Sequence, residues 1–308
     1  MIEVLDGGAL SMVQDGGRPG FRHLGIPLSG AADRLSLALA NWMVGNPWNY
    51  PALETTLGGL KIRCHTDLVA AVAGADMGAQ KNGKTVKNFS ALSMQAGDNL
   101  SLSHPKIGCR AYIALAGGLS AEQFLGSQST YIPAKLGGIE GRALEVGDRF
   151  LLKKQAFIKR EIPTGYRPSL SNHIILRAMP GPEFSKLSLA SQRALFIKPF
   201  MATPQSNRMG CQLKGNRVKL AKPKSMISGP LLPGTLQIPP KGPPILALVD
   251  GHCTGGYPRA LQVIRADHWQ MGQIAPGMKV SFRRAFGDSH TILKHRKAHF
   301  GFIDGFEF

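Results

Sequence analysis

The sequence has little of several features, and each shortage excludes a class of protein. Of 308 residues only 19 are Asp or Glu, against 37 Lys and Arg, which gives a formal net charge of +18. The longest apolar runs, residues 68–74 and 245–249, fall far short of the roughly 20 residues that a membrane span needs. The first residues lack the basic and apolar regions of a signal peptide. We therefore expect a cytoplasmic protein that does not enter a membrane.

Cysteine is also scarce. The four cysteines are far apart, and no two form a Cys-x-x-Cys pair, so the sequence predicts no disulfide framework. His295 and His299 would share one face of a helix, but the basic residues beside them would repel a metal cation. We interpret this stretch as a basic surface tail and predict no metal site.

The positive charge could serve nucleic acid, an anionic small substrate or acidic partner proteins, or could simply be a solvated surface. The dense basic stretches, residues 219–224 and 283–297, lack the interleaved aromatic residues of a single-strand binding surface. Zinc-finger spacing and basic-region heptads are missing as well. These absences argue against nucleic-acid binding.

Short strands bounded by Gly and Pro dominate the pattern. The predicted strands cover residues 2–5, 68–73, 99–103, 110–116, 172–178, 245–249 and 279–283. A glycine-centred turn precedes a strand three times, at Gly97, Gly147 and Gly277. This recurrence predicts a mainly-β fold with barrel-like units rather than a βαβ sheet.

Helical patterns are few and short. Apolar residues at spacings of three and four predict a helix over residues 31–44. Ser120 and Gln123 form a capping-box pattern, which predicts a single-turn helix closed by Gly126. A third helix is expected over residues 186–197. Such scattered helices would cap a β architecture.

The regular pattern lapses over residues 153–172, which contain three turn-forming Pro and Gly residues. We interpret this stretch as the connection between two mainly-β halves. At about 150 residues per domain, the expected division is an N-terminal domain over residues 1–165 and a C-terminal domain over residues 166–308.

Three polar, glycine-containing loops could carry chemistry: residues 13–20 (VQDGGRPG), 203–210 (TPQSNRMG) and 250–259 (DGHCTGGYPR). The first two place an arginine beside a carboxylate or amide, a combination that can bind a carboxylate or oxyanion in a bidentate way. Ordinary turns are the alternative for both. The third loop follows an apolar strand, which could hold it at a barrel rim. His252 and Cys253 are poor candidates for a base and nucleophile pair, because neighbours in a strand point to opposite faces.

Several catalytic signatures are absent. The sequence has no Gly-x-Gly-x-x-Gly after a strand and no Gly-x-Ser-x-Gly elbow. It also lacks Ala-Met-Lys-Met, the tetrapeptide around a biotinylated lysine, so any covalent carrier would belong to another chain. A self-contained enzyme is hard to assemble from these residues.

Blocks along nearly the whole chain carry a family resemblance. They include HLGIP at 23–27, SGAAD at 29–33, LETTLGG at 53–59, RAY at 110–112, LGSQSTY at 125–131, GRAL at 141–144, SNRMG at 206–210 and TGGYPR at 254–259, besides the loop at 13–20. In this order they resemble the biotin-dependent carboxyltransferase family. That family includes the carboxyltransferase region of urea carboxylase, often called allophanate hydrolase subunit 2, and the C subunit of bacterial 5-oxoprolinase.

The resemblance implies a pair of cyclophilin-like β-barrel domains. Chains of this length in the family look like the C subunit of 5-oxoprolinase, a hydrolase component that acts with a cyclophilin-like B subunit and with an A subunit. Together these subunits open the lactam of 5-oxoproline, an anionic substrate, to glutamate with ATP. ATP would be bound in this complex, either here in a non-classical way or by a partner chain. The alternatives are a carboxyltransferase served by biotin on another chain, and a regulatory protein that antagonises an inhibitor of a histidine kinase.

Under this reading the polar loops supply the site. The candidate catalytic residues are Asp15, Arg18, Arg208 and Asp250: the arginines would neutralise a carboxylate or oxyanion, and the aspartates would act as bases or orient the arginines. The candidate substrate-binding residues are Ser206, Asn207, His252, Thr254, Gly255, Gly256 and Tyr257. His252 stands where the family usually has glutamine, and it can still donate or accept one hydrogen bond.

Overall fold

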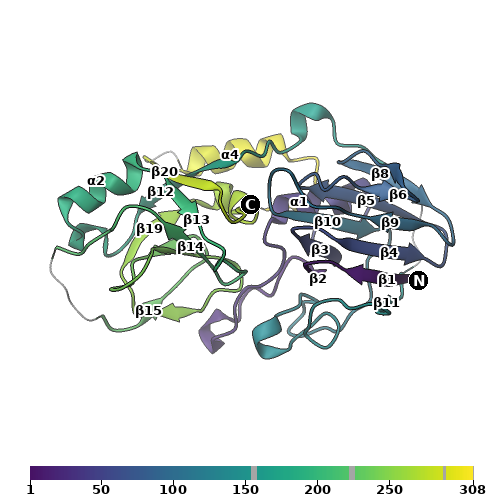
Figure 1. Cartoon of the computed structure of the whole chain (residues 1–308), viewed down its shortest axis with the longest axis horizontal. Coiled ribbons are helices and arrows are strands. Elements are labelled where there is room, and N and C mark those ends of the chain that lie inside the picture. The colour runs from purple at the N-terminus through teal and green to yellow at the C-terminus, as the bar shows by residue number, and fades with distance from the viewer. Residues whose placement is uncertain (154–157, 222–225, 287–288, 308) are drawn as a thin grey trace. The chain divides into compact units, whose positions relative to one another are not determined.

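The computed structural model describes residues 1–153, 158–221, 226–286 and 289–307. The chain forms two compact units, which Figure 1 shows in ribbon form. The first unit comprises Met1–Arg18, Ser29–Leu170 and Lys297–Glu307, and the second comprises Pro19–Leu28 and Ser171–Arg296. The predicted mainly-β class is confirmed.

The first unit contains two sheets. One has the strand order β11-β1-β4-β9-β6-β7, and the other has the order β2-β3-β10-β5-β8. In chain order the strands are β1 (Ile2–Gly7), β2 (Leu10–Gln14), β3 (Ala52–Thr56), β4 (Leu60–Cys64), β5 (Leu68–Gly74), β6 (Gln80–Lys81), β7 (Lys84–Thr85), β8 (Ser90–Met94), β9 (Asn99–Ser101), β10 (Arg110–Leu115) and β11 (Arg149–Phe150).

Apolar side chains from both sheets form one core. Strand β4 alternates buried and exposed residues, so Ile62 points inward while Lys61 and Arg63 face solvent. Strands β5 and β10 are buried at every position. Ile62 from the first sheet and Val72 and Ile113 from the second belong to the same buried cluster.

The second unit contains a closed barrel with the strand order β12-β19-β16-β17-β14-β13-β20, and a two-stranded ribbon of β15 and β18. The barrel closes through a parallel pair, β12 with β20, while its other pairs are antiparallel. The bounds are β12 (His173–Pro180), β13 (Phe200–Ala202), β14 (Gly210–Lys214), β15 (Gly229–Pro230), β16 (Thr235–Gln237), β17 (Ile245–Ala247), β18 (Thr254–Gly255), β19 (Arg259–Val263) and β20 (Lys279–Arg284).

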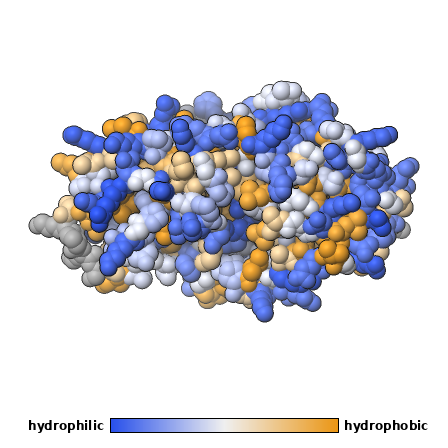
Figure 2. Space-filling model, in the orientation of Figure 1, coloured by the Kyte–Doolittle hydropathy of each residue, from blue (hydrophilic) through white to orange (hydrophobic). Residues whose placement is uncertain are grey.

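The helices are short. They are α1 (Arg34–Met43), α2 (Leu189–Ile197), α3 (His268–Met271) and α4 (Ser289–His299), with single 3-10 turns at Arg22–Leu24, Ile132–Ala134, Thr164–Tyr166, Phe184–Lys186 and Arg265–Asp267. Helix α1 packs against β5 and β10. In the part of the chain that the structure describes, no helix is both long and apolar enough to cross a membrane. Figure 2 shows one largely hydrophilic face with separate hydrophobic patches.

The predicted helix at 31–44 begins later than expected. Its N-cap is Asp33, whose carboxylate accepts hydrogen bonds from the Ser36 N–H at 2.9 Å and the Ser36 hydroxyl at 2.6 Å. Ser29 and Gly30 before it have positive φ angles of 53° and 79°. The expected helix at 186–197 is likewise shorter, because Ser188 is the N-cap of α2 and the helix begins at Leu189.

One helical expectation is wrong. Residues 120–126 form no helix: Glu122 pairs with Gly138, and Phe124 pairs with Ser127 across a tight turn. The Ser120 N–H, which the capping-box pattern pairs with Gln123, instead donates to the Leu151 carbonyl at 3.0 Å. The stretch interpreted as a basic surface tail, with His295 and His299, lies in α4, and residues 287–288 are outside the described part of the chain.

The recurring glycine turn is confirmed. Gly97, Gly147 and Gly277 have φ angles of 91°, 93° and 84°, and in each turn the next residue's N–H bonds to the carbonyl three residues back. Such angles strain any residue with a Cβ. The three turns lead directly into β9, β11 and β20.

The division into domains at residue 165 stays a prediction. The structure does show that the units are discontinuous in sequence. Pro19–Leu28 groups with the second unit and Lys297–Glu307 with the first. Residues 154–157 of the expected connection lie outside the described residues.

Candidate functional site

Asp15 follows β2 and holds a neighbouring loop in place. Its Oδ1 accepts hydrogen bonds from the Gly17 N–H at 2.7 Å, the Ser127 hydroxyl at 2.7 Å and the Ser129 hydroxyl. Its Oδ2 accepts from the Gln128 N–H at 2.6 Å. Both carboxylate oxygens are therefore engaged in joining two loops. This geometry gives Asp15 a positioning role, and its predicted role as a general base stays a prediction.

Arg18 supports the same loop. Its side chain is fully buried, its guanidinium donates to the Ser129 carbonyl, and it lies 5.9 Å from the centre of the Phe124 ring. A buried guanidinium costs free energy unless hydrogen bonds and packing compensate. Arg18 thus helps to fix residues 127–130, and its predicted contact with substrate stays a prediction.

A cavity of about 200 Å³ lies beside this loop in the first unit. Asp15, Gly16 and Gln128 line it together with Asn49 and Lys153. An added Cβ on Gly16 would come within 2.8 Å of the Asn49 Cβ, so glycine keeps this wall thin. The mixture of a cation, amides and backbone groups suits a small polar ligand.

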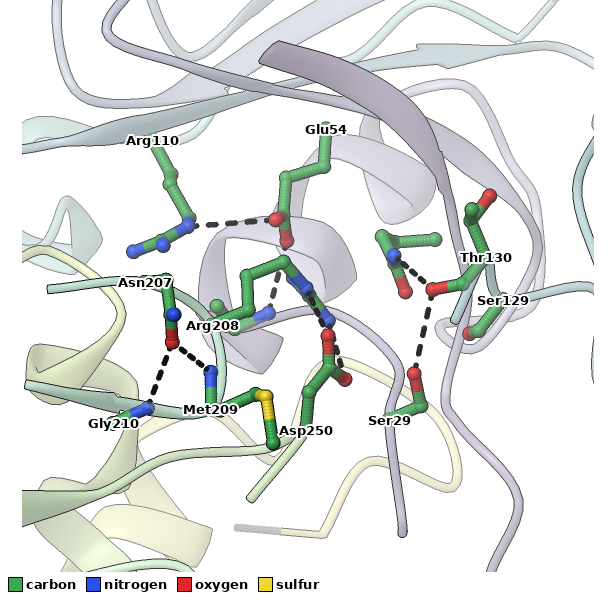
Figure 3. Close-up of polar contacts among 12 residues, drawn as sticks. Ser29, Glu54, Arg110, Ser129, Thr130, Asn207, Arg208, Met209, Gly210 and Asp250 are labelled. Carbon is green, nitrogen blue, oxygen red and sulfur yellow. Dashed lines mark hydrogen bonds and ion pairs between the residues drawn. The ribbon is translucent and has the colours of Figure 1, made fainter. Parts of the chain in front are cut away.

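In the second unit, the structure brings Arg208 and Asp250 together. The Arg208 Nε lies 2.7 Å from Asp250 Oδ2, and Nη2 lies 3.2 Å from Oδ1, as Figure 3 shows. Both residues are buried, and the Asp250 N–H also donates to the Arg208 carbonyl at 3.1 Å. A two-point contact fixes the plane of the guanidinium. The geometry therefore supports the orienting role for Asp250.

Ser206 and Asn207 shape the loop that carries Arg208. The Asn207 Oδ1 accepts from the Met209 N–H at 2.8 Å and from the Gly210 N–H at 3.2 Å (Figure 3). The Ser206 hydroxyl oxygen accepts from the Gln212 N–H at 3.2 Å. These side chains accept hydrogen bonds from backbone N–H groups in and after the turn before β14. Their predicted contact with substrate stays a prediction.

The loop after Asp250 is more exposed. Thr254 and Gly255 form β18, which pairs with β15, and Gly256 follows directly. His252 is exposed, and Tyr257 is 43% exposed. These side chains stand on a peripheral ribbon, whereas Arg208 and Asp250 lie buried, so the predicted residues of this unit have two different environments.

Arg259, at the end of the same loop, forms a structural ion pair. Its Nε and Nη2 each lie 2.9 Å from a carboxylate oxygen of Glu183, and its N–H donates to the same group. Hydrogen bonds from Arg259 hold the pKa of Glu183 below its usual value. This pair anchors the start of β19 to the turn after β12.

The sequence prediction missed a buried polar network in the first unit. Glu54 on β3 lies opposite Tyr112 on β10, and its Oε2 accepts from the Tyr112 hydroxyl at 2.7 Å and the Ala32 N–H at 2.9 Å. Arg110 Nε lies 3.4 Å from Glu54 Oε1 (Figure 3). The Tyr112 hydroxyl in turn accepts from the Asp33 N–H at 2.8 Å.

Burial dominates the electrostatics of this network. Glu54 is fully buried, and Arg110 is 4% exposed. Burial, followed by the charges of Glu54 and Asp33, raises the pKa of Tyr112 well above its ordinary value, so Tyr112 stays a neutral donor. Buried ionisable groups cluster at functional sites, although structural networks produce the same pattern. The available signal was a single charged residue within each of two buried strands, Glu54 in β3 and Arg110 in β10.

The carboxyltransferase domain, subdomain A and B, is the family whose sequence model matches this chain, over residues 24–284. The chain belongs to this carboxyltransferase family. The resemblance predicted from the sequence blocks is thereby confirmed.

Two similar relatives of this carboxyltransferase-family chain are bacterial proteins. The C subunit of the 5-oxoprolinase of Escherichia coli (strain K12) is 40% identical over 282 residues, which cover 92% of this chain and 90% of that protein. The protein of the same name in Haemophilus influenzae is 34% identical over 282 residues, which again cover 92% of this chain and 90% of that protein. Among solved structures, the urea amidolyase of K. lactis matches with a TM-score of 0.91 at 30% identity, covering 99% of this chain but 20% of that one.

Within residues 1–153, 158–221, 226–286 and 289–307, no group of three or more His, Cys, Asp and Glu residues is arranged to hold a metal ion. The polar groups described above are arginines, carboxylates and amides, which suit an anionic or amide-containing ligand.

Proposed function

We propose that this chain is the C subunit of an ATP-dependent 5-oxoprolinase, a cytoplasmic complex that hydrolyses 5-oxo-L-proline to L-glutamate with its A and B subunits. The observation that carries the proposal is the 40% identity to the C subunit of a 5-oxoprolinase along 90% of that protein's length. A relative matched from end to end in this way supports a shared role more strongly than a match to one part of a larger enzyme.

The proposed hydrolysis of the lactam needs few catalytic groups from this chain. Hydrolysis breaks the lactam C–N bond, adds water across it, and leaves an amine and a second carboxylate. An amide in a relaxed five-membered ring resists water, so transfer of the ATP γ-phosphoryl group to the lactam oxygen would supply a leaving group. The overall reaction consumes two waters, one to open the lactam and one to release the phosphoryl group as phosphate, and its products are glutamate, ADP and phosphate. We assign the binding of ATP to a partner chain, because the P-loop sequence pattern at residues 78–85 forms the β6–β7 hairpin and not a loop that leads into a helix.

Arg208 is our first candidate for contact with the anionic substrate. Asp250 fixes its guanidinium at two points, and both side chains are buried, so the positive charge is preorganised where solvent screens it little. In the first unit, the polar cavity beside Asp15 offers Lys153 and the amide of Asn49. These groups would bind a carboxylate or a polarised carbonyl oxygen.

Reconstitution tests the function. The purified chain is mixed with the A and B subunits, 5-oxoproline and ATP, and both glutamate and ADP are measured. We expect glutamate only when all three subunits and ATP are present. A complete complex that forms no glutamate would overturn the proposal, and binding to the B subunit without turnover would favour the regulatory alternative.

A conservative variant tests Arg208 itself. Arg208→Lys keeps the charge beside Asp250 but loses the planar fork, whereas alanine would leave a buried carboxylate unpaired. We expect a loss of about 100-fold in kcat/KM, the usual order for one preorganised electrostatic contact. Arg193→Lys, on the exposed side of α2, is the matched control and should be unchanged. Full activity in Arg208→Lys, with a native circular dichroism spectrum, would remove Arg208 from the site.

A second candidate function is carboxyl transfer from biotin carried by another chain. The TM-score of 0.91 to a urea amidolyase over 99% of this chain favours it. Incubation with carboxybiotin and urea, scored by carboxylated product, separates it from 5-oxoproline hydrolysis. Product in this assay, with none from 5-oxoproline and ATP, would reverse our order of preference.

A further inference from the structure

A second cavity, of about 390 Å³, lies in the second unit. Its walls come from the loop after β13, the end of β14 with residues 215–218, and the loop before β17. None of the predicted site residues is among its described walls. Its size falls within the range of small-molecule sites.

The polar part of this cavity is basic. Lys214 and Arg217 supply positive charges, and Gln205, Gln212 and Asn216 supply amide groups. In the described part of the chain, neither Lys214 nor Arg217 forms an ion pair with a carboxylate. The sequence explains why, since residues 184–249 contain no Asp or Glu at all. Two unneutralised cations at one cavity favour an anionic ligand.

The remaining wall is apolar. Val218 is 9% exposed, Ile238 is 5% exposed, and Pro244 is buried beside them in the cavity lining. Thr203 also lines the cavity, and its buried hydroxyl has no hydrogen-bond partner among the described residues. An unsatisfied buried hydroxyl costs free energy, and a bound ligand or water could supply the missing partner. The wall therefore suits the body of an organic molecule rather than a bare ion.

We propose that this cavity is a binding site for a small organic oxyanion. The ligand's carboxylate or phosphate group lies against Lys214 and Arg217, and its apolar body lies against Val218 and Ile238. Arginine binds either oxyanion in a bidentate way, so the shared chemistry is a planar or tetrahedral group of anionic oxygens. The cavity is a site apart from Arg208 and Asp250, and its ligand does not depend on the 5-oxoprolinase proposal.

Three probes with one ring define the ligand class. Titration calorimetry of the full chain compares phenyl phosphate, benzoate and benzamide, the last being a neutral counterpart of benzoate. We expect saturable binding of at least one anion and roughly tenfold weaker binding of benzamide, as a lost charge-assisted hydrogen bond predicts. The tighter anion assigns the site to phosphate esters or to carboxylates. Absence of saturable binding by both anions at millimolar concentration would overturn the proposal.

Two double variants locate the site. K214Q/R217Q should weaken the preferred anion roughly tenfold or more. R193Q/K198Q removes one Arg and one Lys from exposed positions at α2, outside the cavity, and should leave the affinity within about twofold. All four side chains are exposed, so both variants should fold. Equal losses in the two variants would show diffuse attraction to a basic surface and would contradict a defined site.

Discussion

The two units differ sharply in charge. The first unit contains 18 Lys and Arg against 15 Asp and Glu, a net charge of +3. The second contains 19 against 4, a net charge of +15. Nearly all of the chain's excess of +18 therefore belongs to one unit. The charge is thus a property of a particular surface and its sites, which a single value for the whole chain conceals.

Asp15 of the first unit and Asp250 of the second unit are buried in different ways. In the first unit, Asp15 is held by hydroxyl and backbone N–H donors, which spread its charge over a loop. In the second unit, Asp250 is held by the guanidinium of Arg208. A carboxylate held by neutral donors depends on many small contributions, whereas a buried ion pair depends on one partner. This difference predicts different responses to mutation.

The largest effect is expected in the second unit. Asp250→Ala leaves the Arg208 charge buried without this carboxylate, which should lower the free energy of unfolding by about 3–5 kcal/mol. Hydrogen exchange resolved by peptide measures the loss in each unit separately. Peptides of the barrel should lose protection, while those of the two-sheet unit should not.

The neutral double variant Arg208→Gln/Asp250→Asn is the control for this experiment. It removes both charges and should cost less than Asp250→Ala, because no unpaired charge stays buried. If the double variant proved less stable than Asp250→Ala, the unpaired Arg208 charge would not be the cause of the loss, and the predicted difference between Asp250 and Asp15 would be wrong.

Sequence patterns predicted most of the β architecture because strand burial and turn glycines are local signals. The alternation in β4 and the turns at Gly97 and Gly147 are examples. The expected helix at 120–126 failed because Glu122 bonds to Gly138, a partner that no local pattern reveals. Helix ends shifted for a simpler reason, since a side-chain cap such as Asp33 decides them.

The polar loops could be located from the sequence, but the roles of their residues could not. An arginine beside glycines suggests a ligand clamp equally well at residue 18 and residue 208, yet Arg18 is fully buried against a loop and Arg208 is paired with Asp250. Glu54 was missed because its partner Tyr112 lies 58 residues away and meets it only through strand register. Long-range pairing of this kind is not encoded in any short motif.

An intermediate effect is expected in the first unit. Asp15→Asn keeps the shape but removes the charge and replaces one acceptor oxygen with a donor, which faces either the Ser127 hydroxyl or the Gln128 N–H. We expect a loss of about 2–3 kcal/mol, the usual range for hydrogen bonds to a charged group. Peptides covering residues 10–20 and 120–140 should exchange faster, and barrel peptides should not change.

Ser129→Ala is the graded comparison for Asp15→Asn. It removes one hydroxyl donor to the carboxylate and the acceptor of the Asp15 N–H, while the other donors to Asp15 remain, so it should cost about 1–2 kcal/mol, less than Asp15→Asn. A loss as large as that of Asp15→Asn would mean that one donor dominates, and the proposed spreading of the charge over the loop would be wrong.

The smallest effect is expected in a test of acid sensitivity. The first unit should account for most of this sensitivity, because it contains 15 of the 19 Asp and Glu residues. Asp98, in the turn before β9, accepts from Lys81 at 2.7 Å, and this contact, with the Gln95 N–H, lowers its pKa from 3.8 to about 2. A lowered pKa stabilises the fold above pH 3.8, and this stabilisation is lost as the pH falls towards 2. Asp98→Asn should therefore lower Tm by about 1–3 °C at pH 6, as expected for a partly exposed pair, and by progressively less as the pH approaches 2. Thermal unfolding of the variant and the natural sequence across this range measures the gap. A gap in Tm that stays constant down to pH 2 would show that the charge of Asp98 adds nothing to the stability of the fold, and it would contradict the prediction.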